Sequence, residues 1–181
     1  MADLDAAHTD HVAALFARAR QRLLAAGLSS RSSLTATQHQ ALAFLAHHPG
    51  CTVGELAAGL AVSCPAATKL VDRLAAKSLA QRLPGDSDRR QVRVQLSFVG
   101  AQALSQVEQA RREILEGVFA HLPRARHLGL LRGMEAMLSR LVADADTALS
   151  LCFHCGPAHT ADCPLNRIHR ALAGRDLPHQ L

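Results

Sequence analysis

Residues 60–100 read LAVSCPAATKLVDRLAAKSLAQRLPGDSDRRQVRVQLSFVG, and the expected fold follows from this segment. Ser63 is a good N-cap, and Pro65 falls in the first turn of the helix that follows, where its missing N–H costs little. After this helix, residues 79–83 and 92–96 alternate apolar and polar side chains, which is typical of short strands. The stretch therefore predicts a helix followed by a two-stranded hairpin.

A shorter helix is expected just before this stretch. Thr52 and Glu55 form a capping box, in which the Thr52 hydroxyl accepts from the Glu55 amide and the Glu55 carboxylate reaches back. Two short helices joined by LAVS (residues 60–63) make a helix-turn-helix, whose second helix enters the major groove of DNA. Because a hairpin follows directly, the pattern is that of a winged helix-turn-helix.

The second helix has a polar face that stays outside when its apolar residues are buried. Lys69 and Arg73 are four residues apart, so one helix face carries both cations. Such side chains contact phosphates or guanine edges, and a threonine contacts phosphate or a thymine methyl group. An ordinary solvated helix face is the alternative. The candidate DNA-binding residues of this helix are Ser63, Pro65, Ala66, Thr68, Lys69 and Arg73.

The tip of the hairpin brings opposite charges together. Arg89 and Arg90 stand at or beside the turn, where guanidinium groups can enter a narrow minor groove. Asp88 can hold a neighbouring arginine in one rotamer, which reduces the entropy lost on binding DNA. As a surface salt bridge the same pair would add only about 0–1 kcal/mol to stability. We therefore include Asp88, Arg89 and Arg90 in the predicted DNA interface.

Long amphipathic segments flank the winged helix-turn-helix. We expect one helix over residues 4–26, one from Ser97 to a break at Pro123, and a further helix that runs on to Leu149. Their apolar stripes exceed what a small winged helix can cover, which favours dimerisation over a monomer with a helical second domain. The expected fold is mainly α with a small β-wing, a winged helix-turn-helix plus long helical dimerisation arms. The expected domains are an N-terminal dimerisation helix (1–34), the DNA-binding domain (35–97), C-terminal dimerisation helices (98–150) and a Cys/His-rich tail (151–181).

Residues 60–100 resemble the MarR family of bacterial transcription regulators. Ala61 and Ser78 depart from the family pattern, which often has glycine at the first position and usually at the second. The resemblance covers about residues 4–150 and implies a homodimer with interleaved terminal helices that binds a near-palindromic operator in double-stranded DNA. The shared features are V-D-R-L at residues 71–74, the charged residues 88–90, and Leu96-Ser97 with Gly100.

The resemblance also implies a pocket between the dimer arms and each winged helix, often for a small aromatic acid. His39, His47 and His48 lie near that junction in the expected arrangement and are the candidate ligand contacts. Structural or exposed histidines are the alternative reading of these three positions.

The composition limits the class of protein. The formal net charge is +5 and the pI about 9.4, which suits a polyanionic partner, although solubility alone also explains many basic proteins. The N-terminus lacks an apolar signal core and no apolar run approaches the length of a membrane span, so we expect a cytoplasmic protein without a membrane segment. No nucleophile–base pair, Gly-rich phosphate loop or pair of acids stands out, so we do not expect an enzyme.

The C-terminal segment is rich in cysteine and histidine. Cys152 and Cys155 form C-x-x-C, and Cys163 follows at the expected start of another helix. With His159 or His169 as a fourth ligand, these cysteines predict a tetrahedral Zn²⁺ site. The alternatives are an iron–sulfur cluster, a thiol switch in which two cysteines form a disulfide, and a reduced tail without a cofactor.

Together these features predict a sequence-specific dimeric DNA-binding regulator, a repressor released by a small ligand. Two alternatives use the same fold. One is a metal- or redox-responsive regulator that senses through the Cys/His tail. The other is a protein-interaction module that has lost DNA binding.

Overall fold

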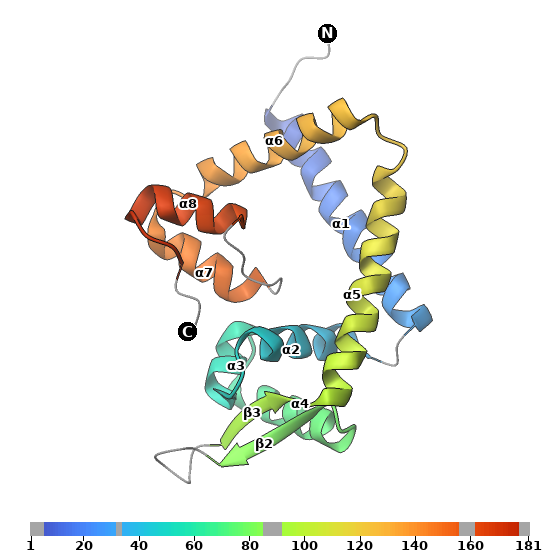
Figure 1. The fold of residues 1–181 in the computed structure, drawn as a ribbon, viewed down its shortest axis with the longest axis vertical. Coiled ribbons are helices and arrows are strands. Elements are labelled where there is room, and N and C mark those ends of the chain that lie inside the picture. The colour runs from blue at the N-terminus through green and yellow to red at the C-terminus, as the bar shows by residue number, and fades with distance from the viewer. Residues whose placement is uncertain (1–5, 32–33, 85–91, 156–161, 178–181) are drawn as a thin grey trace.

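Helices α2 to α4 and a small sheet form a winged helix-turn-helix at one end of the molecule (Figure 1). The computed structural model describes residues 6–31, 34–84, 92–155 and 162–177. The helices are α2 (Ala36–His47), α3 (Val53–Gly59) and α4 (Cys64–Ala76). The strands are β1 (Cys51–Thr52), β2 (Ala80–Pro84) and β3 (Val92–Leu96). The expected mainly α fold with a small β-wing is confirmed.

Helix starts lie where the capping residues predict them. The Thr52 hydroxyl accepts from the Glu55 amide at 3.2 Å, and the Glu55 carboxylate accepts from the Thr52 amide at 2.7 Å. Ser63 caps α4, and Ser97 caps the long helix α5 (Phe98–Phe119). Each of these hydrogen bonds satisfies an amide that has no partner inside the helix.

The sheet contains one strand that the sequence pattern did not predict. The order is β1-β3-β2 with antiparallel pairing, so Val94 of β3 lies opposite Cys51 on one side and Arg82 on the other. β1 has two residues, which is too short for an alternating pattern to be recognised. It ties the start of α3 to the wing.

The core of this part is aliphatic. Leu42 and Leu45 of α2, Leu56 of α3, Leu74 of α4 and Val94 of β3 are fully buried. Each such leucine or valine contributes about 1.5–3 kcal/mol of hydrophobic stabilisation. Because α4 is anchored through this face, its opposite face is left to solvent.

Two long helices form the arm that rises from the winged helix. α1 (Ala6–Arg31) packs along α5, and α6 (Arg124–Leu141) crosses their far ends (Figure 1). α1 continues through Gly27, where the sequence pattern predicted a stop. A single helical glycine costs only about 1 kcal/mol relative to alanine, and packing along α5 offsets that cost.

The single helix expected up to Leu149 is wrong, because the chain breaks after Leu141. α7 (Ala145–Cys155) starts anew, with Asp144 accepting hydrogen bonds from the Thr147 amide at 2.7 Å and the Thr147 hydroxyl at 2.9 Å. α8 (Pro164–Ala173) packs against α7. These helices enclose a second apolar cluster of Val142, Ala148, Leu165 and Leu177.

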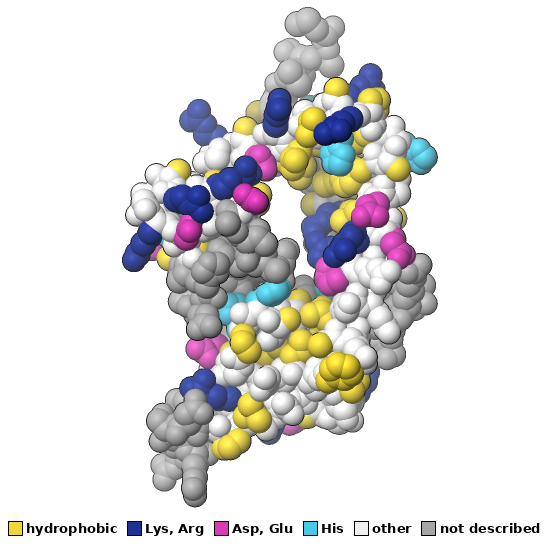
Figure 2. All heavy atoms as spheres, in the orientation of Figure 1, with side chains coloured by type: hydrophobic (Ala, Val, Ile, Leu, Met, Phe, Trp, Pro, Cys, Tyr) yellow, Lys and Arg dark blue, Asp and Glu magenta, His cyan; other side chains and the backbone are white. Residues whose placement is uncertain are grey.

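Helices α5 to α8 and the winged helix surround an opening in the middle of the molecule, which is visible in both the ribbon and the space-filling view (Figures 1 and 2). α5 leads from the winged helix to α6, and α7 and α8 turn back toward the winged helix. In the described part of the chain, every helix is too short or too polar to cross a lipid bilayer.

Candidate nucleic-acid interface

Helix α4 has one buried face and one face that is exposed to solvent. Its inner face is formed by Ala67, Leu70, Val71 and Leu74, all buried. The six residues that the sequence predicts as DNA contacts are all exposed on the other side. Lys69 and Arg73 therefore stand together on the outer face, one turn apart.

Two of these six residues also act within the helix. The Ser63 hydroxyl accepts from the Ala66 amide at 3.4 Å and so caps the N-terminus. The Thr68 hydroxyl donates to the carbonyl of Cys64 at 2.9 Å. These bonds orient both side chains before any ligand arrives, which lowers the entropy lost on binding.

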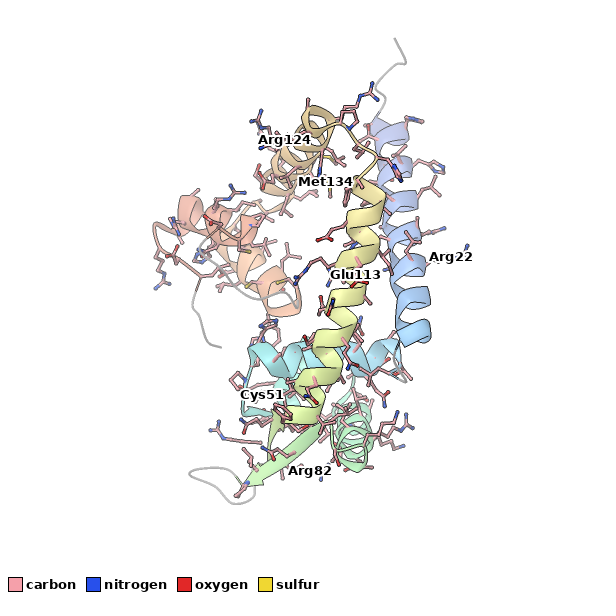
Figure 3. The ribbon with its side chains drawn as sticks, turned by 45° about the vertical axis from the view of Figure 1, so that its right-hand side comes forward. Arg22, Cys51, Arg82, Glu113, Arg124 and Met134 are labelled. Carbon is pink, nitrogen blue, oxygen red and sulfur yellow. The ribbon has the colours of Figure 1, made fainter. Side chains whose placement is uncertain are left out.

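An ion pair joins α4 to the wing. Arg82 Nη2 of β2 lies 2.6 Å from Asp72 Oδ1 of α4, and the two side chains are 40% and 58% exposed. Figure 3 shows Arg82 at the winged-helix end of the molecule, opposite the end that carries Arg124 and Met134. Arg82 was missed from the sequence because alternation along a strand marks it only as polar; its pairing with Asp72 depends on how β2 folds back.

Hydrogen bonds of Ser97 hold the end of the wing and the start of α5 against the segment that follows α4. Its hydroxyl donates to the Ser78 carbonyl at 2.6 Å and accepts from the Gly100 amide at 2.9 Å, and its amide donates to the Leu79 carbonyl at 3.1 Å. A Cβ on Gly100 would lie 1.9 Å from the Leu79 carbonyl oxygen. The glycine is therefore needed for α5 to start against the end of α4.

Left-handed backbone occurs at the two positions where the sequence departs from the family pattern. Ala61 has φ 51° and Ser78 has φ 57°. Both lie at the ends of helices, Ala61 after α3 and Ser78 after α4. Glycine adopts this conformation without the steric cost of a Cβ, which explains why it is the expected residue.

The predicted wing-tip contacts lie outside the described residues. Asp88, Arg89 and Arg90 fall between Pro84, where β2 ends, and Val92, where β3 begins. Their role in DNA binding stays a prediction. The two strands establish only that the chain returns here toward the sheet.

Of the three candidate effector histidines, His39 and His47 lie on α2 and His48 follows it directly. His39 Nε2 is 3.0 Å from Glu108 Oε1 of α5, and this hydrogen bond, with Arg111 nearby, lowers the pKa of the Glu108 carboxyl. His48 stacks on Phe44 at a centroid distance of 4.2 Å, and His47 is half-buried. An open groove of about 370 Å³ lies elsewhere, between α6 and α8, and none of the three histidines lines it.

The residues of the predicted metal site are only partly brought together. Cys152 and Cys163 pack against the same apolar cluster, and Cys155 ends α7. His169 is buried, and its Nδ1 bonds to the Arg175 carbonyl at 2.9 Å. His159 lies outside the described residues, among which no group of three or more potential ligands could hold a metal ion. Zinc, or the alternative iron–sulfur cluster, is thus without structural support here and stays a prediction.

Comparison with known proteins identifies the same region. The sequence profile described as "MarR family" matches residues 32–91. The chain is 28% identical over 109 residues to the uncharacterised HTH-type transcriptional regulator YsmB of Bacillus subtilis, covering 60% of this chain and 71% of YsmB. The profile match contains the helix-turn-helix, α3 and α4.

Solved structures share the fold. Apo wild-type MarR from E. coli superposes with a TM-score of 0.61 at 26% identity, over 75% of this chain and 98% of that one. A variant of S. aureus MepR bound to an oligodeoxyribonucleotide superposes with a TM-score of 0.58 at 18% identity, over 74% of this chain and 97% of that one. At this identity the second match shows the fold alone.

Proposed function

We propose that this chain, whose residues 32–91 match the profile of the MarR family of transcription regulators, binds a specific operator in double-stranded DNA as a homodimer and represses transcription until a small ligand releases it. As a transcription regulator of this family it is not an enzyme. The single observation that carries DNA binding is the exposed outer face of α4, with Lys69 and Arg73 one turn apart. This function places the protein in the bacterial cytoplasm.

The dimensions and charge of α4 suit the major groove. The groove admits one α-helix, and lysine and arginine side chains bind phosphates or guanine edges there. The Arg82 guanidinium neutralises Asp72 on the same helix, which removes a repulsive charge from the approach to phosphate. The MepR relative, which has the same fold, was solved with an oligodeoxyribonucleotide bound.

Exposed apolar side chains support the homodimer. α6 has no buried residue, yet it carries Leu128, Leu130, Leu131, Met134, Met137 and Leu141, all exposed. α1 adds exposed Val12, Leu15 and Phe16. Figure 2 shows hydrophobic side chains gathered beside the opening at the end away from the winged helix. Monomeric proteins rarely leave such contiguous apolar surface in water, so a second copy of the chain covers it.

The two-fold symmetry of such a dimer determines what DNA it reads. Two copies of α4 enter successive major grooves, with half-sites about 34–36 Å or one helical turn apart. The wing of each copy then lies over the adjacent backbone, where Arg89 and Arg90 reach the minor groove.

The proposed effector site lies along α2, at the junction of α2 and α5. His39 and Glu108 join these helices, so a bound acid that competes for His39 would alter the angle between the winged helix and the arm. The proposed effector is a small aromatic acid, and the proposed contacts are His39, His47 and His48.

The test is binding to promoter fragments from the host genome against random duplex of equal length at physiological salt. Arg73→Ala should weaken specific binding by roughly 5- to 150-fold, since one good base-edge contact is worth about 1–3 kcal/mol. Lys69→Ala, as a phosphate contact, should reduce the salt slope by about 1. Arg124→Ala, at the opposite end of the molecule (Figure 3), is the matched control. No preference for any native fragment would refute the proposal.

A further inference from the structure

Helices α7 and α8 form a hairpin with an apolar core of its own. A hydrogen-bonded segment closes this core, because the Asn166 side chain accepts from the Leu177 amide at 2.8 Å and donates to Asp176 Oδ1 at 3.1 Å. Both helices and the segment after α8 share these contacts, so the hairpin moves as one body. The buried apolar residues of the hairpin core are Val142, Ala148, Leu165 and Leu177.

One side of the hairpin is anchored on the end of the arm. Leu138 of α6 packs against the hairpin core, and Arg167 Nη2 of α8 lies 2.6 Å from Glu135 Oε1 of α6. An ion pair between such accessible groups contributes little stability by itself. The packing of Leu138 and the short connection between α6 and α7 add to it, so the hairpin follows α6.

The other side of the hairpin contacts the winged helix through Phe153 of α7. Its ring centroid lies 5.1 Å from that of Phe44 in an edge-on contact and 5.1 Å from that of His48. Phe44 is 5% exposed and belongs to the core of the winged helix. A Cβ on Gly59 of α3 would lie 2.0 Å from Phe44 Cε2. Phe153 thus contacts a ring that lies directly on the first helix of the helix-turn-helix.

These contacts close a ring of helices around the central opening. α5 connects the winged helix to α6, and the hairpin returns from α6 to α2 (Figure 1). A domain that is joined to an arm at one side can rotate about that junction, and a second contact on the other side restrains the rotation. With the hairpin docked, the orientation of α4 relative to the arm is therefore restrained.

We propose that Phe153 is a specificity-determining residue for operator spacing, because its contact with Phe44 and His48 fixes the separation of the two α4 helices in the dimer. This inference rests on the proposed function. In a two-fold dimer the separation of the recognition helices depends on how each winged helix is oriented on its own arm. A restrained winged helix loses little entropy on an operator of matching spacing, whereas another spacing requires the contact of Phe153 to break.

The first experiment tests the docking without DNA. Amide hydrogen exchange of the full chain is followed by mass spectrometry in the parent, in Phe153→Ala and in Leu151→Ala. Leu151 is the matched control, because it lies on the same helix with 42% of its surface exposed. Loss of an aromatic contact should speed exchange in residues 44–48 by about 2- to 10-fold, while exchange in α8 stays unchanged. Equal exchange in the parent and in Phe153→Ala would overturn the docking.

The second experiment measures the tolerance of half-site spacing. Operator duplexes carry the two half-sites at the selected spacing or one base pair further apart, which moves them by about 3.4 Å and turns them by about 35°. Fluorescence anisotropy gives the ratio of the two affinities. Phe153→Ala should lower this ratio by about fivefold or more, and Leu151→Ala should keep the ratio of the parent. An unchanged ratio in Phe153→Ala, or a parent chain that binds both duplexes equally, would overturn the proposal.

The ratio separates positioning from stability. A variant that is only less stable loses affinity for both duplexes alike and keeps the ratio. Phe153→Leu, which leaves an apolar side chain in the hairpin, repeats both measurements if exchange in α8 shows that alanine disturbs the hairpin. If the parent chain binds no operator, the proposed function fails, while hydrogen exchange still decides whether Phe153 docks on the winged helix.

Discussion

Arg82 Nη2 lies 2.6 Å from Asp72 Oδ1, so β2, the first strand of the wing, is joined to α4 by an ion pair between exposed groups. Such pairs contribute little to stability, typically about 0–1 kcal/mol. Its consequence is therefore geometric and electrostatic: the pair orients β2 relative to α4 and neutralises the carboxylate beside Arg73.

The first prediction is that this pair is coupled in DNA binding but not in folding. In a double-mutant cycle, Asp72→Ala and Arg82→Ala should show a coupling energy of about 0.5–3 kcal/mol in operator affinity, because they are in direct contact. The free energy of unfolding of the same variants, measured by thermal melts, should change by no more than about 1 kcal/mol. Additive losses of affinity would mean that each residue acts on DNA independently.

Gly100 should be intolerant of any side chain. Gly100→Ala places a methyl group against the Leu79 carbonyl, and such overpacking typically costs about 1–3 kcal/mol. Urea denaturation measures the loss. Gly117→Ala on the same helix is the matched control, since no atom lies within 4 Å of its added Cβ; equal destabilisation of the two variants would contradict the account of the wing junction.

Glycine at the two left-handed positions should stabilise the protein. The conformation costs a non-glycine residue about 1–2 kcal/mol, and the greater freedom of glycine in the unfolded chain offsets part of the gain. Ala61→Gly and Ser78→Gly should therefore each raise the free energy of unfolding by several tenths of a kcal/mol. Ala101→Gly, inside α5 with ordinary helical backbone, should lower it by about 0.5–1 kcal/mol. The opposite order would show that strain at these turns is absent.

Acid should destabilise the junction of α2 and α5. The hydrogen bond from His39 and the nearby Arg111 hold the pKa of Glu108 below its usual value, so its contribution is present above the unfolded-state pKa of about 4.3 and is lost as pH falls through the folded-state pKa. Glu108→Gln should therefore give a flatter decline in stability below about pH 4.3. Thermal melts across that pH range test this prediction. Parallel curves of stability against pH for the parent chain and Glu108→Gln would show that Glu108 does not contribute to the pH dependence.

A charge in the apolar face of α6 should dissociate the dimer. Met134→Glu inserts a carboxylate among exposed leucines and methionines, where an unpaired buried charge is strongly unfavourable. Light scattering should show twice the chain mass of 19.3 kDa for the parent protein and a single chain for the variant. Arg140→Glu, a charge reversal near the end of the same helix, should stay dimeric. A monomeric parent chain would refute the homodimer.

The spacing of the predicted metal ligands along the sequence was not enough to predict how the fold arranges them. Cys152, Cys155 and Cys163 are close in sequence and lie on or beside packed helices, as their spacing suggests. His169, however, is buried, and its Nδ1 bonds to the Arg175 carbonyl. The buried residues of α8 are Leu165, Asn166 and His169, and the spacing of potential ligands contains no information about which face of a helix is buried.

The sequence alone determined the helix starts at Thr52, Ser63 and Ser97, because each N-cap bonds to an amide three residues away and needs no other part of the chain. It also determined the winged helix-turn-helix, since periodicity and turn residues act over short distances. Tertiary structure decided the contacts of Asp72 with Arg82, Gly100 with Leu79 and Phe44 with Phe153. Those partners meet only when strands and helices fold back on one another, and no local pattern encodes the side of each element that will face the other.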